Sequence, residues 1–206
     1  LVLVTAPTEE PVSLAEAQLH LRMEITPVTS PATTYPEDSL VRVLITAARM
    51  HCEAFQNRAY VTQVWDLFLE KVPTENYIEI PLPPLQSLVA LSYKDGSGSL
   101  QAVSFLDPSG TSLMETDDYI VDSSCQPGRL CLKNGKSWPQ SLQEAKAVQV
   151  SFIAGYGPAE DVPQQIKVAI LLKVSELYEN RGDQEAGARF GEATKALLWP
   201  DRIIPC

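Results

Sequence analysis

The spacing of apolar residues changes twice along the chain, from a helical period to a period of two and back. Near the start, Ser13-Leu14-Ala15-Glu16 fits a capping box, in which the serine hydroxyl and the glutamate carboxylate bond to unpaired amides at a helix start. The proline- and threonine-rich stretch 26–36 is typical of a loop. A longer helix is then predicted over 38–58, because the acidic pair Glu37-Asp38 favours a helix N-terminus.

This long helix is predicted to be amphipathic, with one apolar face turned to a core. The residues predicted to pack there are Leu40, Leu44, Ala47 and Phe55, with His51 and Ala54 on the same line. The polar face is predicted to carry Arg42, Thr46, Arg49, Glu53 and Gln56. Such a helix needs a partner that covers its apolar side.

From about Tyr60 to Gly155 the period becomes two, with many β-branched and aromatic residues. The predicted strands lie within 61–70, 77–80, 87–93, 118–122, 128–133 and 147–156. Asp95-Gly96 and Asn134-Gly135 are predicted to form the tight turns of hairpins. Because the connections are too short for crossover helices, we expect an antiparallel sheet or a small sandwich.

After Gly157 the helical period returns. Asp161 is the predicted N-cap of a helix, Pro163 suits its first turn, and Asn180-Arg181-Gly182 is the predicted stop. Its core residues are predicted to be Ile166, Ile170, Val174 and Leu177. A further helix is predicted around Glu192 to Leu198, followed by an apolar tail.

The predicted fold class is therefore α+β. We expect a helical bundle core formed by the N- and C-terminal helices, because their two apolar stripes can cover each other. The expected domains are 1–59 for the N-terminal helical part, 60–157 for an inserted antiparallel β domain, and 158–206 for the C-terminal helical part and tail. The two ends of the insertion should lie close together.

Gly155-Tyr156-Gly157 could be a phosphate-binding loop or a joint between a strand and a helix. The third glycine of a dinucleotide loop and the Gly-Lys-Ser/Thr of a Walker loop are both missing. Glu160 and Asp161 also place negative charge where a phosphate would bind. The pattern therefore favours a joint.

Composition excludes several classes. The chain carries a formal charge of −10, and its basic residues are scattered, whereas tight binding to DNA phosphates needs a basic face. Four cysteines without a CxxC motif predict free thiols in a reducing cytoplasm. No run approaches the roughly 18 apolar residues of a membrane span. The short apolar start, 1–7, has no basic residue, so no secretory signal is expected.

Candidate chemistry is sparse. His20 and His51 are the histidines, and neighbours such as His51 and Cys52 point about 100° apart on a helix, which prevents a dyad. Glu37-Asp38 and Asp117-Asp118 are interpreted as a helix start and a turn, Cys125 and Cys131 lack a partner histidine, and Ser13 lacks a nucleophile elbow. We therefore expect no catalytic residue, metal or cofactor.

Aromatic and proline residues suggest contacts. The run 77–84 is interpreted as an edge strand that prolines terminate, and it could also be a binding epitope. Trp138 and Trp199 are predicted to anchor loops on a core, while Trp199 could instead bind a partner.

Taken in order, these segments resemble the head-tail connector proteins of long-tailed bacteriophages, also called adaptor or head-completion proteins. The resemblance is to the larger subgroup that carries a β insertion in a helical core, and similar adaptors occur in gene transfer agents. It rests on the order of five segments from Pro11 to Arg181, and not on a catalytic motif. The segments are PVSLAEAQLHLR, EDSLVRVLITAARMHCEAFQNRAYVTQVWDLFL, IPLPPLQSLVALSYKDGSG, DYIVDSSCQPGRLCLKNGKSWP and VSFIAGYGPAEDVPQQIKVAILLKVSELYENR.

The resemblance implies a structural virion protein that assembles with itself into a ring, usually a dodecamer, beneath the portal after DNA packaging. The ring would join the capsid to the stopper or tail. The genome would pass through its lumen without specific binding, as the acidic charge of each copy also suggests. The protein would reside at the head-tail interface, and in the host cytoplasm during assembly, away from membranes.

By the same resemblance, the C-terminal part engages the portal. The candidate contact residues are Leu197, Leu198, Trp199, Ile203 and Ile204. The alternative for this tail is that it packs back onto its own helices. For the whole protein, the alternatives are a protein- or carbohydrate-binding module that uses the β segment, and an enzyme with a site assembled from distant residues.

Overall fold

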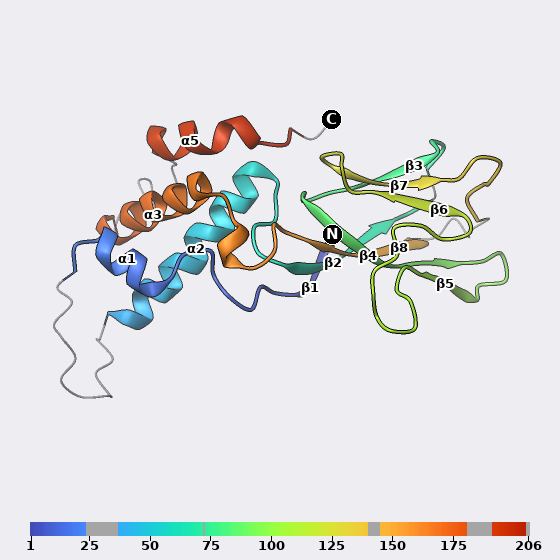
Figure 1. Cartoon of the computed structure of the whole chain (residues 1–206), viewed down its shortest axis with the longest axis horizontal. Coiled ribbons are helices and arrows are strands. Elements are labelled where there is room, and N and C mark those ends of the chain that lie inside the picture. Colours follow the sequence, from blue (N-terminus) through green and yellow to red (C-terminus); the bar gives the residue numbers. More distant parts are fainter. Residues whose placement is uncertain (24–36, 72, 140–144, 181–190, 205–206) are drawn as a thin grey trace. The chain divides into compact units, whose positions relative to one another are not determined.

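The computed structural model describes residues 1–23, 37–71, 73–139, 145–180 and 191–204. The fold is α+β (Figure 1). The helices are α1 (Leu14–His20), α2 (Asp38–Gln56), α3 (Gln164–Glu179) and α5 (Glu192–Leu198), with 3-10 turns η1 (Ala159–Asp161) and η2 (Trp199–Asp201). The strands are β1 (Val2–Thr5), β2 (Gln63–Leu69), β3 (Tyr77–Ile80), β4 (Leu85–Lys94), β5 (Leu100–Ser104), β6 (Tyr119–Asp122), β7 (Gly128–Leu132) and β8 (Val148–Ala154).

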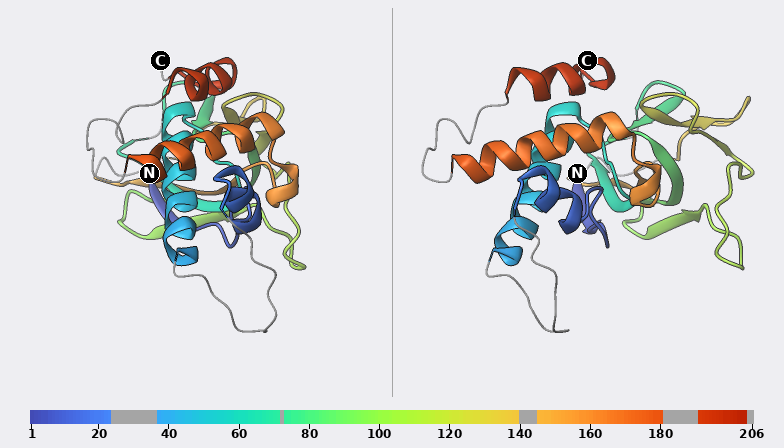
Figure 2. Two further views of the ribbon diagram at one scale, coloured as in Figure 1. Left: turned by 90° about the vertical axis from the view of Figure 1, so that its left-hand side faces the viewer. Right: turned by 60° about the vertical axis from the view of Figure 1, so that its left-hand side comes forward.

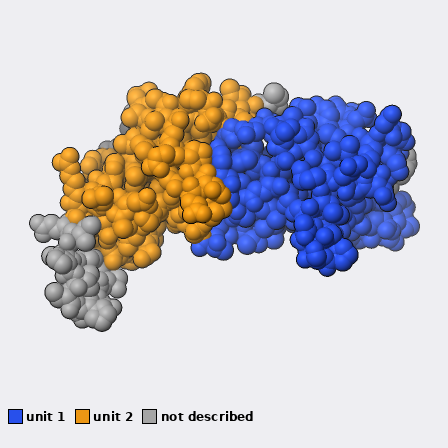
Figure 3. Space-filling view, in the orientation of Figure 1, with its two compact units in different colours: residues 1–8, 58–157 blue, residues 9–57, 158–206 orange. Residues whose placement is uncertain are grey.

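The chain divides into two compact units, coloured separately in Figure 3. One unit consists of Leu1–Thr8 and Arg58–Gly157 and holds all the described strands. The other consists of Glu9–Asn57 and Pro158–Cys206 and holds the helices.

The strand unit contains two antiparallel sheets, with orders β1-β2-β8-β4-β5 and β3-β7-β6. β8, the central strand of the five-stranded sheet, alternates between buried and partly exposed side chains, as expected for a strand with one face on the core. Its buried residues are Val148, Val150, Phe152 and Ala154. They share one core cluster with residues of the other sheet, such as Ile80 and Leu130. The six predicted strands are present, and their antiparallel pairing is confirmed.

Two strands, β1 and β5, were not predicted. In β1 four apolar or β-branched residues follow one another without alternation, and all four are exposed. The Asp95 turn does connect a hairpin, β4 to β5, with Asp95 N–H donating to the Ser99 carbonyl at 3.0 Å. At Asn134-Gly135 the hairpin prediction was wrong. The chain turns there, with Lys136 N–H donating to the Lys133 carbonyl at 3.0 Å, but the turn follows β7 and joins no paired strands.

The ends of the strand unit's long segment are hydrogen-bonded to each other. Tyr156 N–H donates to the Tyr60 carbonyl at 2.8 Å, and Thr62 N–H donates to the Gly157 carbonyl at 3.1 Å. Gly155 and Gly157 have positive φ angles of 121° and 132°. A Cβ at Gly155 would lie 2.5 Å from the Val61 carbonyl oxygen, so only glycine fits this close approach.

The helical unit is built on α2, which packs against α3, while α5 packs against α3 on the far side from α1 (Figures 1 and 2). The capping box at Ser13 is confirmed, with Ser13 N–H donating to Glu16 Oε2 at 2.7 Å and the Ser13 hydroxyl accepting from Glu16 N–H at 3.2 Å. Hydrogen bonds to the Glu16 carboxylate, first from the Ser13 hydroxyl at 2.7 Å and then from the Ser13 N–H, lower the pKa of Glu16. The predicted helix at Glu192 to Leu198 is also confirmed as α5.

The buried face of α2 differs from the prediction. It runs through Val41, Ile45, Ala48 and Cys52, all nearly inaccessible. Leu40, Leu44 and Phe55 are only partly buried, and Ala47 is exposed, so Ala47 is not a core residue. On α3, Ile166, Ile170 and Val174 are buried, and Leu177 is partly buried.

Arg49 and Gln56, predicted on the polar face, are buried as well. Arg49 is tolerated there because its guanidinium bonds to Glu10 at 2.7 Å and to Glu53 at 2.6 Å.

The predicted N-cap at Asp161 was wrong. Asp161 lies in η1, and α3 begins three residues later after Pro163, without a side-chain cap. The carboxylate that bonds to an amide of this turn is that of Glu9, which accepts from Ala159 N–H at 2.8 Å. A residue distant in the sequence has replaced the local cap.

Candidate interaction surfaces

The C-terminal segment is anchored on the end of α2. The Gln56 side chain donates to the Leu198 carbonyl at 2.6 Å, and Ile203 N–H donates to the Gln56 carbonyl at 2.9 Å. Asn57, which ends α2 with a positive φ of 54°, donates from its side chain to the Ile203 carbonyl at 2.7 Å. Part of the tail therefore packs back onto its own helices.

The predicted partner contacts divide accordingly. Leu198 is fully buried, and Leu197 and Ile203 are partly buried. Trp199 and Ile204 remain 59% and 69% exposed. Arg202 lies between two rings, with its guanidinium 4.6 Å from the Phe55 centroid and 5.4 Å from that of Trp199. This cation–π contact holds the indole in place while leaving most of it accessible.

An ion pair fixes the start of α5. Glu176 accepts from Gly191 N–H and from the Thr194 hydroxyl, both at 3.1 Å through Oε1, and from Lys173 Nζ at 3.1 Å through Oε2. Lys173 is fully buried, and the Glu176 carboxylate is an ion-pair partner for its ammonium group. The carboxylate at the amide end of α5 also compensates the helix dipole. Gln165 of α3 further donates to the Leu197 carbonyl.

The same buried region shows why His51 and Cys52 are poor catalytic groups. Burial, followed by the charge of Lys173, lowers the pKa of His51. Burial raises the pKa of the Cys52 thiol to about 12, so the thiol stays protonated at neutral pH. A thiol needs a lowered pKa to act as a nucleophile, and this environment does the opposite.

The remaining predicted positions have structural partners. Gly155 N–H donates to the Pro84 carbonyl at 2.9 Å, and Tyr156 N–H is also bonded, so these amides are not available to a phosphate. The Glu37 carboxylate accepts from the Tyr178 hydroxyl at 2.9 Å, and Asp38 accepts from Gln18 at 2.6 Å.

The Asp118 carboxylate and the Cys125 thiol also have structural partners. Lys136 pairs with Asp118 at 2.6 Å, and the Cys125 thiol donates to Asp122 at 3.2 Å. Cys52, Cys125 and Cys131 are free thiols, and Cys206 lies outside the described residues. Among the residues that the structure describes, no three metal-binding side chains cluster, and no helix is long and apolar enough to cross a membrane.

Trp138 has a structural position. It stacks on Tyr119 at a centroid distance of 5.6 Å, and its indole N–H donates to the Glu75 carbonyl at 2.8 Å. It therefore closes the core of the strand unit. Tyr77–Ile80 is an edge strand of the three-stranded sheet, as its proline-rich continuation predicted.

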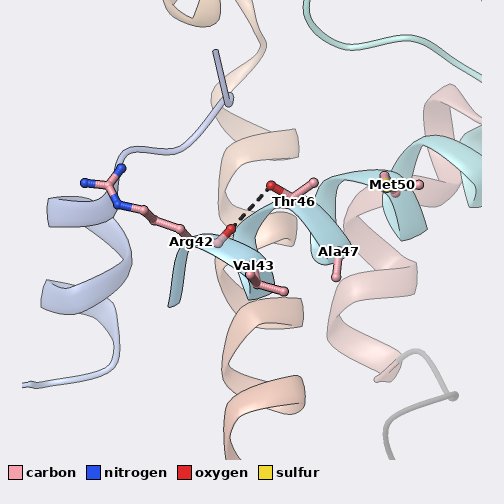
Figure 4. Close-up of a pocket in the computed structure, with 5 residues that line it drawn as sticks. All are labelled: Arg42, Val43, Thr46, Ala47 and Met50. Atoms are coloured by element: carbon pink, nitrogen blue, oxygen red, sulfur yellow. Dashed lines mark hydrogen bonds between the residues drawn. The ribbon is translucent and has the colours of Figure 1, made fainter. Parts of the chain in front are cut away.

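The outward side of α2 carries an apolar stripe that the sequence interpretation missed. A shallow hollow of about 400 Å³ is lined by Arg42, Val43, Thr46, Ala47 and Met50, whose side chains are drawn in Figure 4. Val43 and Met50 are 64% and 58% exposed. The Thr46 hydroxyl contacts the Arg42 carbonyl at 3.3 Å and the Glu10 carboxylate at 2.8 Å.

This hollow has no arrangement of acids, bases or donors around a reacting atom, so it suits contact with an apolar surface. The signal that could have found it is the spacing of Val43, Ala47, Met50 and Ala54 by four, three and four residues, which makes a second apolar line on the same helix.

No protein-family model and no curated protein sequence matches the chain significantly. Solved structures do match over its full length. A chain from the neck of an empty gene transfer agent (GTA) particle, computed with C6 symmetry, has 22% identity and a TM-score of 0.75, covering 100% of this chain and 96% of that chain.

Two further structures agree. A chain in the virion of a native GTA particle has 22% identity and a TM-score of 0.74, with coverage of 100% and 96%. A chain from the neck of a native GTA particle, computed with C12 symmetry, has 18% identity and a TM-score of 0.69, with coverage of 100% and 97%. The protein therefore shares its whole fold with chains of these phage-like particles.

Proposed function

We propose that the protein is a structural component of a virion neck, a head-tail connector that forms a ring beneath the portal after DNA packaging and joins the capsid to the stopper or tail. The observation that carries this proposal is the fold match over 100% of the chain to a chain in a GTA neck. Matching necks computed with C6 and C12 symmetry support a ring of identical copies, with twelve as the expected number.

In this proposal the helical segments are the core and the long strand segment is an insertion, with domains 1–59, 60–157 and 158–206, and β1 at the start of the first domain joins the sheet of the insertion. The hydrogen bonds that join the two ends of the long strand segment, at Tyr60 and Tyr156, support it. An insertion with adjacent ends leaves its host able to fold around the junction.

The proposed role involves no catalysis and no cofactor. It is supported by the protonated, buried thiol of Cys52 and by the occupied amides at Gly155 and Tyr156. A scaffold needs surfaces, and the described surface offers apolar ones at α2, at β1 and at the C-terminal segment. The expected location is the head-tail interface of the virion, reached from the host cytoplasm during assembly.

The portal contact in this proposal is the exposed end of the C-terminal segment. Trp199 and Ile204 would insert into the portal, whereas Leu198, and in part Leu197 and Ile203, would hold the segment on its own helices. An aromatic side chain that is held in place but accessible is typical of binding hot spots.

The test is native mass spectrometry of the full chain with the portal of the same particle. We expect a ring of copies on the portal, and Trp199→Asp should weaken its binding because a charge replaces an apolar contact. Leu19→Asp, at a residue of α1 that is 71% exposed and outside the proposed contact surfaces, is the matched control for adding a charge. Truncation after Asp183 should abolish portal binding.

The truncation also removes the buried Leu198, so its folding must be checked by circular dichroism. A full chain that binds neither portal nor tailless heads would refute the connector role. Unimpaired portal binding by a folded truncated chain would remove only the role of the tail.

A further inference from the structure

The five-stranded sheet ends in two edges that lack the usual protection against pairing. Proteins normally block edge strands with charged side chains or proline. Val2–Thr5 of β1 and Leu100–Ser104 of β5 contain neither. On β1, Val2, Leu3 and Val4 are 49%, 42% and 55% exposed, and on β5 Leu100 is 71% exposed. Apart from the ladders to β2 and β4, the described part of the chain shows no strand paired with either edge.

Backbone groups on both edges point outward. In the β4–β5 hairpin, Asp95 N–H donates to the Ser99 carbonyl and Phe105 N–H donates to the Val89 carbonyl. Because residues of an antiparallel pair alternate between facing the partner and facing away, Gln101 and Val103 bond to β4, and Leu100 and Ala102 present their N–H and C=O groups outward.

The same alternation can be followed across the sheet to β1. Lys94 N–H donates to the Ala147 carbonyl, so the backbone of Ala147 faces β4. The backbone groups of Val148 and of every second residue after it in β8 therefore face β2. Asp66 of β2 then faces Val2, and Leu3 presents its backbone groups outward. The irregularity of β1 lies between Leu3 and Thr5, beyond the regular pairs of Val2 with Asp66 and of Leu3 with Trp65.

The two edges are compatible in direction and charge. Four successive antiparallel pairings separate β1 from β5, so the two strands run in the same direction. If the ring axis runs along the strands, the rotation that relates one copy to the next leaves the strand direction unchanged. β1 of one copy can then lie beside β5 of the next copy, and the two strands are parallel. Copies with a formal charge of −10 repel one another, and both edge strands are free of charge, which favours contact there.

We propose that β1 of each copy adds to β5 of the neighbouring copy and so continues the sheet from subunit to subunit. In a parallel pair, one residue bonds to the two residues that flank its opposite number. With Leu3 opposite Gln101, the Leu3 amide donates to the Leu100 carbonyl and the Leu3 carbonyl accepts from the Ala102 amide. This contact joins two different surfaces of the subunit, so it can close a ring with any number of copies. The inference rests on the proposed ring.

The experiment uses cysteine pairs in the full chain, with Cys125, Cys131 and Cys206 replaced by serine and Cys52 kept because it is buried. The chain is assembled on the portal, the ring is verified by native mass spectrometry, and a mild oxidant is then added. We expect Leu3→Cys combined with Gln101→Cys to give a ladder of covalent oligomers, and each single variant to give none.

A verified ring without the ladder would overturn the strand pairing and leave the connector role intact. Dimers from Leu3→Cys alone would also overturn it, since they indicate β1 paired with β1. Failure to form any ring would overturn both proposals.

A proline test checks the backbone bonds themselves. Ala102→Pro removes an outward amide and leaves the ladder to β4 intact, because proline is tolerated at edge positions whose amide faces outward. We expect ring assembly to weaken by about tenfold for each interface, the effect of one hydrogen bond. The control is Glu79→Pro, which by the same alternation removes an outward amide from the edge of the other sheet. Equal assembly by both variants would refute the pairing.

Discussion

At the residue scale, Gly155 combines two constraints that can be separated by substitution. Its φ of 121° is strained for any side chain, and an added Cβ would also meet the Val61 carbonyl. Gly110 has a φ of 85° with open space around it. We expect Gly155→Ala to lower the free energy of unfolding by about 3 kcal/mol and Gly110→Ala by about 1 kcal/mol.

Urea denaturation of both variants measures the difference between these losses, which is the cost of the close approach alone. Equal losses would show that the strand end at Gly155 can move away from Val61.

The Asp95 carboxylate gives a pH prediction. Hydrogen bonds from the Ser97 side chain, then from Gln101 and the backbone of Ser97 and Ser99, lower the pKa of Asp95 to about 2. An unfolded aspartate titrates near about 3.9. A folded pKa below the unfolded one means that this stabilisation is complete above about pH 4 and is lost as the pH falls through about 2.

An NMR titration of the Asp95 carboxyl carbon should therefore have a midpoint near about 2, and Ser97→Ala should move it upward because the largest cause is removed. Ser109→Ala makes the same change in the equivalent turn at Asp107 and should leave Asp95 unaffected. A midpoint unchanged by Ser97→Ala would contradict the assignment.

At the element scale, α2 explains which features the sequence could and could not predict. Its existence and bounds followed from the acidic start and the apolar period, but three apolar lines run along it, through Leu40, Val41 and Val43. Periodicity alone cannot say which line faces the core. The choice depends on Glu10, which pairs with Arg49 and allows that face to be buried. Local signals such as the capping box were reliable because their partners are neighbours in sequence.

The buried line of α2 can be tested directly. Ile45 is 2% exposed and Met50 is 58% exposed. We expect Ile45→Ala to reduce the free energy of unfolding by about 3 kcal/mol, because it leaves a cavity, and Met50→Ala by less than about 0.5 kcal/mol. Chemical denaturation measures both, and a comparable loss for Met50→Ala would place the outward stripe in the core.

The edge strands β1 and β5 were missed for a physical reason. A strand is recognised from alternation, which arises when one side of a sheet is buried, and β1 is exposed on both sides. The run Val2–Thr5 is therefore apolar without a period. Such a run is stabilised by its backbone pairing with β2, a long-range contact that no local pattern encodes. The candidate contact at β1 could be found only once this pairing was known.

At the scale of the whole molecule, the order of segments predicted the fold class and the adjacency of the ends at Tyr60 and Tyr156. It predicted the candidate contact surface less well. Of the five predicted contact residues, Trp199 and Ile204 remain mostly exposed and the other three are at least partly buried, because Gln56 bonds to the segment on both sides of the turn at η2. Which residues of an apolar tail are buried depends on such distant partners, and composition does not reveal them.

The acidic charge of the whole chain leads to the last prediction. A protein that holds DNA through phosphate contacts releases counterions, so its affinity falls steeply with salt, by a slope of about −0.9 for each phosphate contacted. In the proposed connector ring, chains with a formal charge of −10 each should make few such contacts, so the genome should move freely. Fluorescence anisotropy of the assembled ring with duplex DNA should show no binding at low salt and no dependence on salt. Strong binding that salt removes would instead place a basic surface around the lumen and refute passage without phosphate contacts.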